Sequence, residues 1–139
     1  MTVLNLTEVV NNYNRALREL KTAMGERFKA ELKTAFKAVF AEYPNVTRLE
    51  WTQYTPYFND GDICVFGVNE VEIWDDTVGK DDEVGVYVCW GEGRQRYPMI
   101  ADLADNLSRA DTLLLEMFGD HCRITVTPEG IDVEEYEHD

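Results

Sequence analysis

The sequence predicts a single α+β domain over residues 1–139: a small antiparallel sheet packed with a long N-terminal helix and a second amphipathic helix, and ending in a β-hairpin. Three observations predict it. Apolar residues recur at helical spacing over residues 7–43, and apolar and polar residues alternate in short segments after residue 45. The length of 139 residues suits one hydrophobic core. The hydrophobic fraction of 45% can build that core, which excludes a disordered acidic chain.

The long helix is predicted from apolar residues that follow one another in steps of three or four. They are Val10, Tyr13, Leu17, Leu20, Met24, Phe28, Leu32, Phe36, Val39 and Tyr43. Thr7 suits the N-cap position, and Pro44 predicts the end of the helix. Gly25 is the place for a break, but the apolar phase persists across it, so we expect one long or kinked helix from Thr7 to Tyr43 within the helical segment 1–43. Its apolar stripe either covers the sheet or mediates homo-oligomers.

Strands are predicted where apolar and polar residues alternate. In residues 46–53, Leu49 and Trp51 share one face, while Arg48, Glu50 and Thr52 share the other. The sequence Asn59-Asp60-Gly61 predicts a turn. Further strands are expected at residues 63–68, 71–74 and 84–90.

The second helix is predicted to begin at Pro98 and to end before Gly119, because these residues suit the first helical position and the C-terminal cap. Its apolar face comprises Ile100, Leu103, Leu107, Ala110, Leu114 and Met117. Residues 122–127 and 131–136 then form the terminal hairpin. Ile124 and Val126 are expected to face the core from one strand, and Ile131 and Val133 from the other.

The charge is unevenly distributed. The chain has 13 basic and 27 acidic residues, a net charge of −14. Residues 1–43 hold seven basic and five acidic residues, a net of +2, so residues 44–139 hold six basic and 22 acidic residues, a net of −16. This acidic portion repels nucleic-acid phosphates and anionic lipid, and it favours a basic partner. Direct binding to nucleic acid or membrane is therefore not expected, although the same charge also serves solubility alone.

Catalytic chemistry is not predicted. The two histidines are His121 and His138, and the second lies in the terminal tail. His121 and Cys122 are adjacent in a predicted strand, so their side chains point to opposite faces and form no dyad. Cys64 and Cys89 fall in predicted apolar strands, where they are expected to be inert core thiols. Zinc-ligand spacing is absent. We therefore expect a protein that is not an enzyme and has no metal or cofactor. The odd number of cysteines fits the cytoplasm.

Two features indicate other binding sites. Residues 50–62 combine three carboxylates with four aromatic residues, namely Trp51, Tyr54, Tyr57 and Phe58. Such rings on a loop would give a partner rigid contact area or a base a stacking platform, or would instead plug the edge of the sheet. Arg94 and Arg96 stand out in the acidic portion as a pocket for the anion of a phosphorylated small molecule.

The segments WTQYTPYFNDGD (residues 51–62) and FGDHCRITVTPEGIDVEEYEHD (residues 118–139) resemble a pattern in uncharacterised small acidic proteins of tailed phages and bacteria. The resemblance covers most of residues 49–139. It implies a phage or phage-derived source, and a host-directed role such as binding and inhibiting a bacterial protein. It assigns no functional residue.

The leading hypothesis is a phage-type acidic binding or inhibitor protein that docks on a basic surface of a host protein in the host cytoplasm. In its sharpest form it is a DNA mimic with an anti-defence or host take-over role. The carboxylates expected to contact the partner are Asp75, Asp76, Asp81, Asp82, Glu83, Asp102, Asp105, Glu134 and Glu135. One alternative is a protein that sequesters a nucleotide-like molecule between the aromatic loop and Arg94/Arg96. The other is an oligomeric structural or assembly protein.

Overall fold

The computed structural model describes residues 3–57, 61, 63–77 and 85–137, with the side chains described from residue 5 onward. The chain divides into two units, Met1–Lys33 and Thr34–Asp139. The boundary falls within helix α1 (Val3–Glu42), which runs through Gly25 without interruption. The long-helix prediction is therefore confirmed, and the helix ends two residues before Pro44. The helix starts before Thr7, which lies within it, because no residue from Val3 to Leu6 opposes helical geometry.

The first unit is helical, and its side chains from residue 5 to residue 24 are exposed. The apolar stripe of this segment is included: Leu6 is 55% exposed, Tyr13 66% and Leu17 37%. Water therefore contacts the whole length of this stripe in a single chain.

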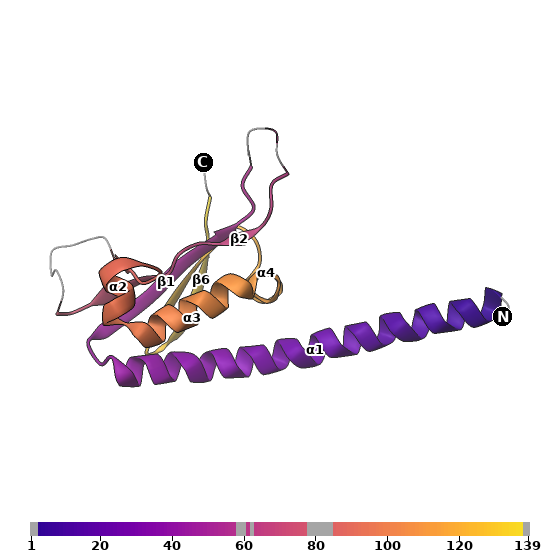
Figure 1. The fold of residues 1–139 in the computed structure, drawn as a ribbon, viewed down its shortest axis with the longest axis horizontal. Helices are drawn as coiled ribbons and strands as arrows, with labels where there is room; N and C mark the ends of the chain where they lie inside the picture. The colour runs from indigo at the N-terminus through magenta and orange to yellow at the C-terminus, as the bar shows by residue number, and fades with distance from the viewer. Residues whose placement is uncertain (1–2, 58–60, 62, 78–84, 138–139) are drawn as a thin grey trace. The chain divides into compact units, whose positions relative to one another are not determined.

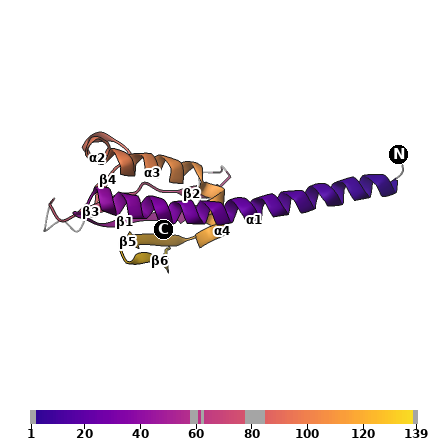
Figure 2. The ribbon, with the colours of Figure 1, turned by 90° about the horizontal axis from the view of Figure 1, so that it is seen from below.

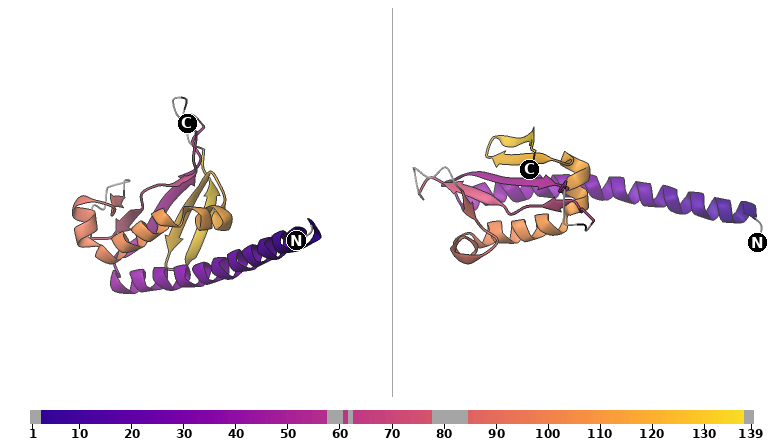
Figure 3. Two further views of the ribbon diagram at one scale, coloured as in Figure 1. Left: turned by 45° about the vertical axis from the view of Figure 1, so that its right-hand side comes forward. Right: turned by 90° about the horizontal axis from the view of Figure 1, so that it is seen from above.

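The second unit contains the antiparallel sheet. Its strands are β1 (Val46–Tyr54), β2 (Gly67–Val68), β3 (Glu72–Asp75), β4 (Val86–Tyr87), β5 (Cys122–Thr127) and β6 (Gly130–Glu135). Strand β2 pairs with the end of β1 (Figure 1). The other strands lie in the order β4-β3-β1-β5-β6 (Figure 2). The hairpin of β5 and β6 forms one edge of the sheet (Figure 3). The α+β prediction is confirmed.

Helices cover one face of this sheet. Residues 34–42 of α1 and helix α3 (Pro98–Arg109) lie on the same side, as Figure 2 shows. Trp51 packs at the centre, with its ring 6.3 Å from that of Phe36 and 6.2 Å from that of Phe118. The most buried apolar side chains of this layer are Val39, Leu49, Trp51, Ile73, Ile100, Leu107, Leu114, Ile124 and Val126. The opposite face of the sheet carries no helix among the described residues.

The predicted second helix is in fact two helices, α3 and α4 (Asp111–Phe118). The break is at Ala110, whose backbone leaves the helical region (φ −102°, ψ 29°). Ala110 makes no side-chain capping bond, and the carboxylate of Asp111, in the first turn of α4, accepts a hydrogen bond from the backbone N–H of Thr112. A further helix, α2 (Gly91–Arg96), was not predicted. A Cβ at Gly93 would lie 1.9 Å from the Tyr87 carbonyl oxygen, so glycine lets α2 pack directly on β4.

Two predicted strands are much shorter than expected. The segment 63–68 contributes only β2, and Ile63 is 86% exposed, because only the last two residues of β1 remain for pairing there. The segment 84–90 contributes only β4, and Val84 lies outside the described residues. Cys64 and Cys89 are therefore half-buried residues outside strands, so their predicted place in strands was wrong.

The edge strand β6 also differs from the prediction. Val133 pairs with Ile124, on the side of the sheet that the helices cover, but it is 43% exposed. The reason is its position on the outermost strand, where the covering layer ends. The prediction that Val133 faces the core was therefore wrong.

Candidate functional site

The uncovered side of the sheet, called the open face below, is polar and aromatic. Along β1, the buried Leu49, Trp51 and Gln53 alternate with side chains that point to the open face. Strand pairing places further residues beside them, because directly paired residues point to the same side. The open face consists of Arg48, Glu50, Thr52, Tyr54, Glu72, Trp74, Tyr87, Arg123, Thr125, Asp132, Glu134 and Tyr136.

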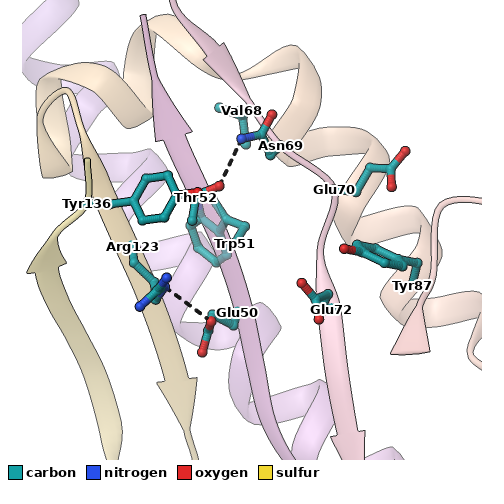
Figure 4. Close-up of a pocket in the computed structure, with 10 residues that line it drawn as sticks. All are labelled: Glu50, Trp51, Thr52, Val68, Asn69, Glu70, Glu72, Tyr87, Arg123 and Tyr136. Atoms are coloured by element: carbon teal, nitrogen blue, oxygen red, sulfur yellow. Dashed lines mark hydrogen bonds and ion pairs between the residues drawn. The ribbon is translucent and has the colours of Figure 1, made fainter. Parts of the chain in front are cut away.

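A hollow of about 490 Å³ lies on the open face, and it is called the acidic hollow below (Figure 4). Its lining combines three carboxylates, two tyrosines and one guanidinium. The lining residues are Glu50, Trp51, Thr52, Val68, Asn69, Glu70, Glu72, Tyr87, Arg123 and Tyr136. Glu50 and Glu72 come from neighbouring strands, and their backbones are directly paired.

The single guanidinium of the hollow is already engaged. Arg123 Nε lies 3.4 Å from Glu50 Oε1, and Arg123 Nη1 lies 3.1 Å from Glu134 Oε1. The same guanidinium stacks over the Tyr136 ring at 5.0 Å. The nearby Arg48 stacks on Trp74 at 3.7 Å, and its Nε lies 3.8 Å from Glu50. Both arginines are therefore held by carboxylates and rings of the open face itself.

Glu70 and Glu72 have a different environment. Glu70 accepts a hydrogen bond from Trp90 Nε1 at 3.3 Å, and Glu72 accepts one from the backbone N–H of Gly85 at 3.3 Å. Within the described part of the chain, neither carboxylate has a cation within ion-pair distance. This side of the hollow thus has negative charge that no cation of the described residues neutralises.

The Tyr87 hydroxyl is sensitive to this charge. The Glu72 carboxylate, together with partial burial and the charge of Glu70, raises the pKa of Tyr87 above its ordinary value of 10.0. The rings of Tyr87 and Trp90 stack with their centroids 6.3 Å apart, and Trp90 is 61% exposed. An exposed pair of rings therefore stands beside the carboxylates of Glu70 and Glu72.

The predicted aromatic loop lies partly beside the hollow. The Tyr57 ring stacks on the His121 ring at 4.7 Å, and the Tyr54 ring lies 5.8 Å from that of Tyr136, which lines the hollow. Trp51 differs, because its side chain is 2% exposed and packs in the core. This agrees with the alternative interpretation, in which aromatic rings pack against the sheet and do not contact a partner. Phe58 lies outside the described residues.

The carboxylates predicted to contact a partner do not gather at one place. Asp75 and Asp76 lie at the end of β3, Asp102 and Asp105 on α3, and Glu134 and Glu135 on β6. Of these six, Glu134 belongs to the open face. Asp81, Asp82 and Glu83 lie outside the described residues.

Asp75 accepts hydrogen bonds from the Tyr97 hydroxyl at 2.7 Å and from the backbone N–H of Thr77 at 2.7 Å. Burial acts to raise the pKa of Asp75, but these hydrogen bonds outweigh it and lower the pKa below 3.8. Asp75 therefore has a structural role, in which it links the end of β3 to the residue before α3.

The two predicted anion-binding arginines point elsewhere. Arg94 donates two hydrogen bonds to the Asp105 carboxylate, at 2.7 and 3.2 Å. Arg96 donates to Thr77 Oγ1 at 3.4 Å. Neither lines the acidic hollow. The predicted site between the aromatic loop and these two arginines is therefore not formed at this hollow.

The remaining reactive groups are few. Burial raises the pKa of the Cys122 and Cys89 thiols, which favours their protonated form. Among the described residues no three histidine, cysteine, aspartate or glutamate side chains are grouped as metal ligands. No helix in the described ranges is long and apolar enough to cross a membrane.

Sequence reasoning missed Glu70, Glu72, Tyr87 and Tyr136 as site residues. The alternation in β1 did place Glu50 and Thr52 on the outward face, but it did not show which strands flank β1. Comparison with known proteins finds no matching family model, no similar curated protein and no similar solved structure.

Proposed function

We propose that this chain is a non-enzymatic binding protein that docks its open face on a basic surface of another protein. The observation that carries the proposal is the acidic hollow, in which Glu70 and Glu72 have no cationic partner within the described part of the chain. A lysine or arginine side chain of the partner would supply the missing charge.

The geometry suits such a side chain. Carboxylates that form charge-assisted hydrogen bonds with ammonium or guanidinium groups bind more strongly than neutral acceptors do. The Tyr87 ring beside Glu72 and the exposed Trp90 ring also attract a cation through their negative faces. The net charge of −14 would increase the association rate with a basic partner at low salt.

A phosphorylated ligand fits the hollow poorly. Its phosphate would meet Glu50, Glu70 and Glu72, while the charge of Arg123 is already neutralised by Glu50 and Glu134. Bringing an anion there would break these ion pairs without removing the repulsion. These contacts favour a cationic partner over a nucleotide.

The partner class follows from charge and from the resemblance of residues 51–62 and 118–139 to small phage proteins. A host protein with a basic surface, including one that binds DNA, has the required chemistry. In its most specific form, the proposal is that this chain inhibits such a protein by occupying its phosphate-binding surface.

The test is to titrate the protein with a lysine- and arginine-rich peptide and to monitor its backbone amide chemical shifts by NMR. The proposal expects shifts concentrated on β1, β3, β4 and β5, and Glu70→Gln/Glu72→Gln should weaken binding about tenfold. The matched control is Glu92→Gln/Glu116→Gln, which removes two exposed carboxylates from α2 and α4.

Because both double variants change the net charge equally, only the location of the lost charge differs. Equal weakening by the two variants would contradict the proposal, since it would mean that the peptide senses the net charge and not the hollow.

A further inference from the structure

The exposed half of helix α1 has a strict heptad repeat. Its apolar residues follow one another in alternating steps of four and three: Leu6, Val10, Tyr13, Leu17, Leu20 and Met24. This is a period of 3.5 residues, which keeps one seam facing a partner helix when two helices supercoil. The repeat ends after Met24, because its next two positions are Arg27 and Glu31.

The seam has no cover in a single chain. Its six side chains are between 37% and 66% exposed. Helices gain most of their stability by packing an apolar face, so a helix of this length with its seam in water lacks its main source of stability. The feature is therefore an interaction surface that is unoccupied in the monomer.

The flanks of the seam favour close approach of a similar helix. On one side the flanking residues are Val9, Ala16 and Ala23, which are apolar and mostly small. On the other side they are Thr7, Asn14 and Lys21, so one charged residue borders the seam. The other charged residues between Leu6 and Met24 lie on the outer positions of the heptad, and a second copy would meet no row of like charges.

The interface would have adequate size. A half-exposed apolar side chain still leaves on the order of 100 Å² to be removed from water. Twelve such side chains from two copies amount to about 1,200 Å², the lower end of the range for specific interfaces. A second copy can therefore cover the seam without any further contact.

Charge determines the favoured direction. The unit Thr34–Asp139 holds seven basic and 23 acidic residues, a net of −16, and it follows the C-terminal end of the seam. In a parallel pair two such units would leave at the same end. In an antiparallel pair they leave at opposite ends, about 27 Å of helix apart, which exceeds the screening length of about 8 Å at physiological salt.

We infer that residues 6–24 of α1 form an antiparallel two-helix coiled coil with the same residues of a second copy. In this register Leu6 faces Met24, Val10 faces Leu20, and Tyr13 faces Leu17 of the other chain. The two copies of Ala16 then lie next to each other. The inference is independent of the acidic hollow and uses none of its residues.

The first experiment measures the molar mass of the full chain by light scattering and sedimentation from micromolar to millimolar concentration. The inference expects twice the 16.0 kDa of one chain. Leu17→Glu/Leu20→Glu should give a monomer with reduced helical circular dichroism and an intact unfolding transition of the second unit. The control Asn11→Glu/Thr22→Glu adds the same charge on the outer positions and should remain dimeric.

The second experiment tests the direction by oxidative cross-linking. Ala16→Cys should form a disulfide-linked dimer, whereas the unsubstituted chain, with its native cysteines, should not under the same oxidant. A monomeric unsubstituted chain would overturn the inference and leave the seam to a different protein. A dimer that survives Leu17→Glu/Leu20→Glu, or a dimer in which Ala16→Cys does not cross-link, would overturn it as well.

Discussion

The two faces of the sheet are built from the same strands but serve different purposes. On the covered face, Ile124 and Trp51 pack in an apolar layer in which Gln53 is the buried polar side chain among the described residues. On the open face, the residues that directly precede these two, Glu50 and Arg123, form an ion pair in contact with water. The covered face supplies the apolar packing that stabilises the fold, so the side chains of the open face can be charged without weakening that packing.

The largest expected effect is on the covered face. Ile124→Ala removes a side chain that is 0% exposed, and it should lower the free energy of unfolding by about 2–5 kcal/mol. The matched control is Thr125→Ala, the next residue, which points to the open face and should change it by no more than about 0.5 kcal/mol. Urea unfolding followed by circular dichroism measures both. Similar losses for the two variants would remove the distinction between the faces.

A smaller effect is expected for the buried amide of Gln53. Its Nε2 donates to the carbonyl oxygens of Leu114 at 3.0 Å and Gly119 at 2.7 Å, and its Oε1 accepts from Trp51 Nε1 at 3.1 Å. Gln53→Leu removes these three hydrogen bonds and leaves the Trp51 indole N–H without this acceptor, while the Gly119 carbonyl still accepts from Cys122 Sγ at 3.2 Å. It should cost about 1–3 kcal/mol in urea unfolding.

The neighbouring Thr52→Val is the control for Gln53→Leu, since the Thr52 hydroxyl lies on the open face, where it accepts from Asn69 Nδ2 at 2.8 Å. It should cost less, because water can replace the lost bond. An unchanged stability of Gln53→Leu would show that an apolar side chain serves equally well at this position.

The smallest effect depends on pH. The Tyr97 hydroxyl, on a side chain that is 2% exposed, donates to Asp75, and burial together with this carboxylate raises the pKa of Tyr97 to about 12. The contribution of this hydroxyl to the free energy of unfolding is complete below pH 10 and is lost as the pH rises toward 12. The lowered pKa of Asp75 acts in the opposite direction, since its contribution is present above pH 3.8 and is lost as the pH falls below that value.

Tyr97→Phe should therefore cost about 1–2 kcal/mol at neutral pH, and less at both extremes. Calorimetric unfolding across the pH range measures this. A loss that is independent of pH would show that the hydroxyl does not depend on the charge of Asp75.

The sequence predicts those parts of the fold that local pattern determines. The stripe of α1 and the alternation around Leu49 and Trp51 are visible in short windows, and both are confirmed. Helix α2 was not predicted, because glycine by itself disfavours a helix. At position 93 it is favourable because the Tyr87 backbone comes too close for a Cβ atom. That approach is a tertiary contact without a local signal.

The candidate site was only partly predictable for the same reason. Glu50 was assigned to the outward face of its strand. The hollow also contains Glu72 and Arg123, which lie on strands that are distant from Glu50 in sequence but pair with β1. The sequence predicts the pairing of the terminal hairpin, but it has no local signal that β3 and β5 flank β1. The abundance of carboxylates made any one of them uninformative. Only the tertiary structure shows that Glu70 and Glu72 line one hollow.

The positions of the three tryptophans give the molecule its own optical reporters. Trp51 is sealed in the core at 2% exposure, so its fluorescence should change mainly when the second unit unfolds. Trp90 is exposed and donates to Glu70 at the margin of the acidic hollow, so its emission should respond when a cation displaces that bond. Trp74 lies beneath the Arg48 guanidinium. Iodide quenching can therefore separate occupancy of the hollow from loss of the fold without any attached dye.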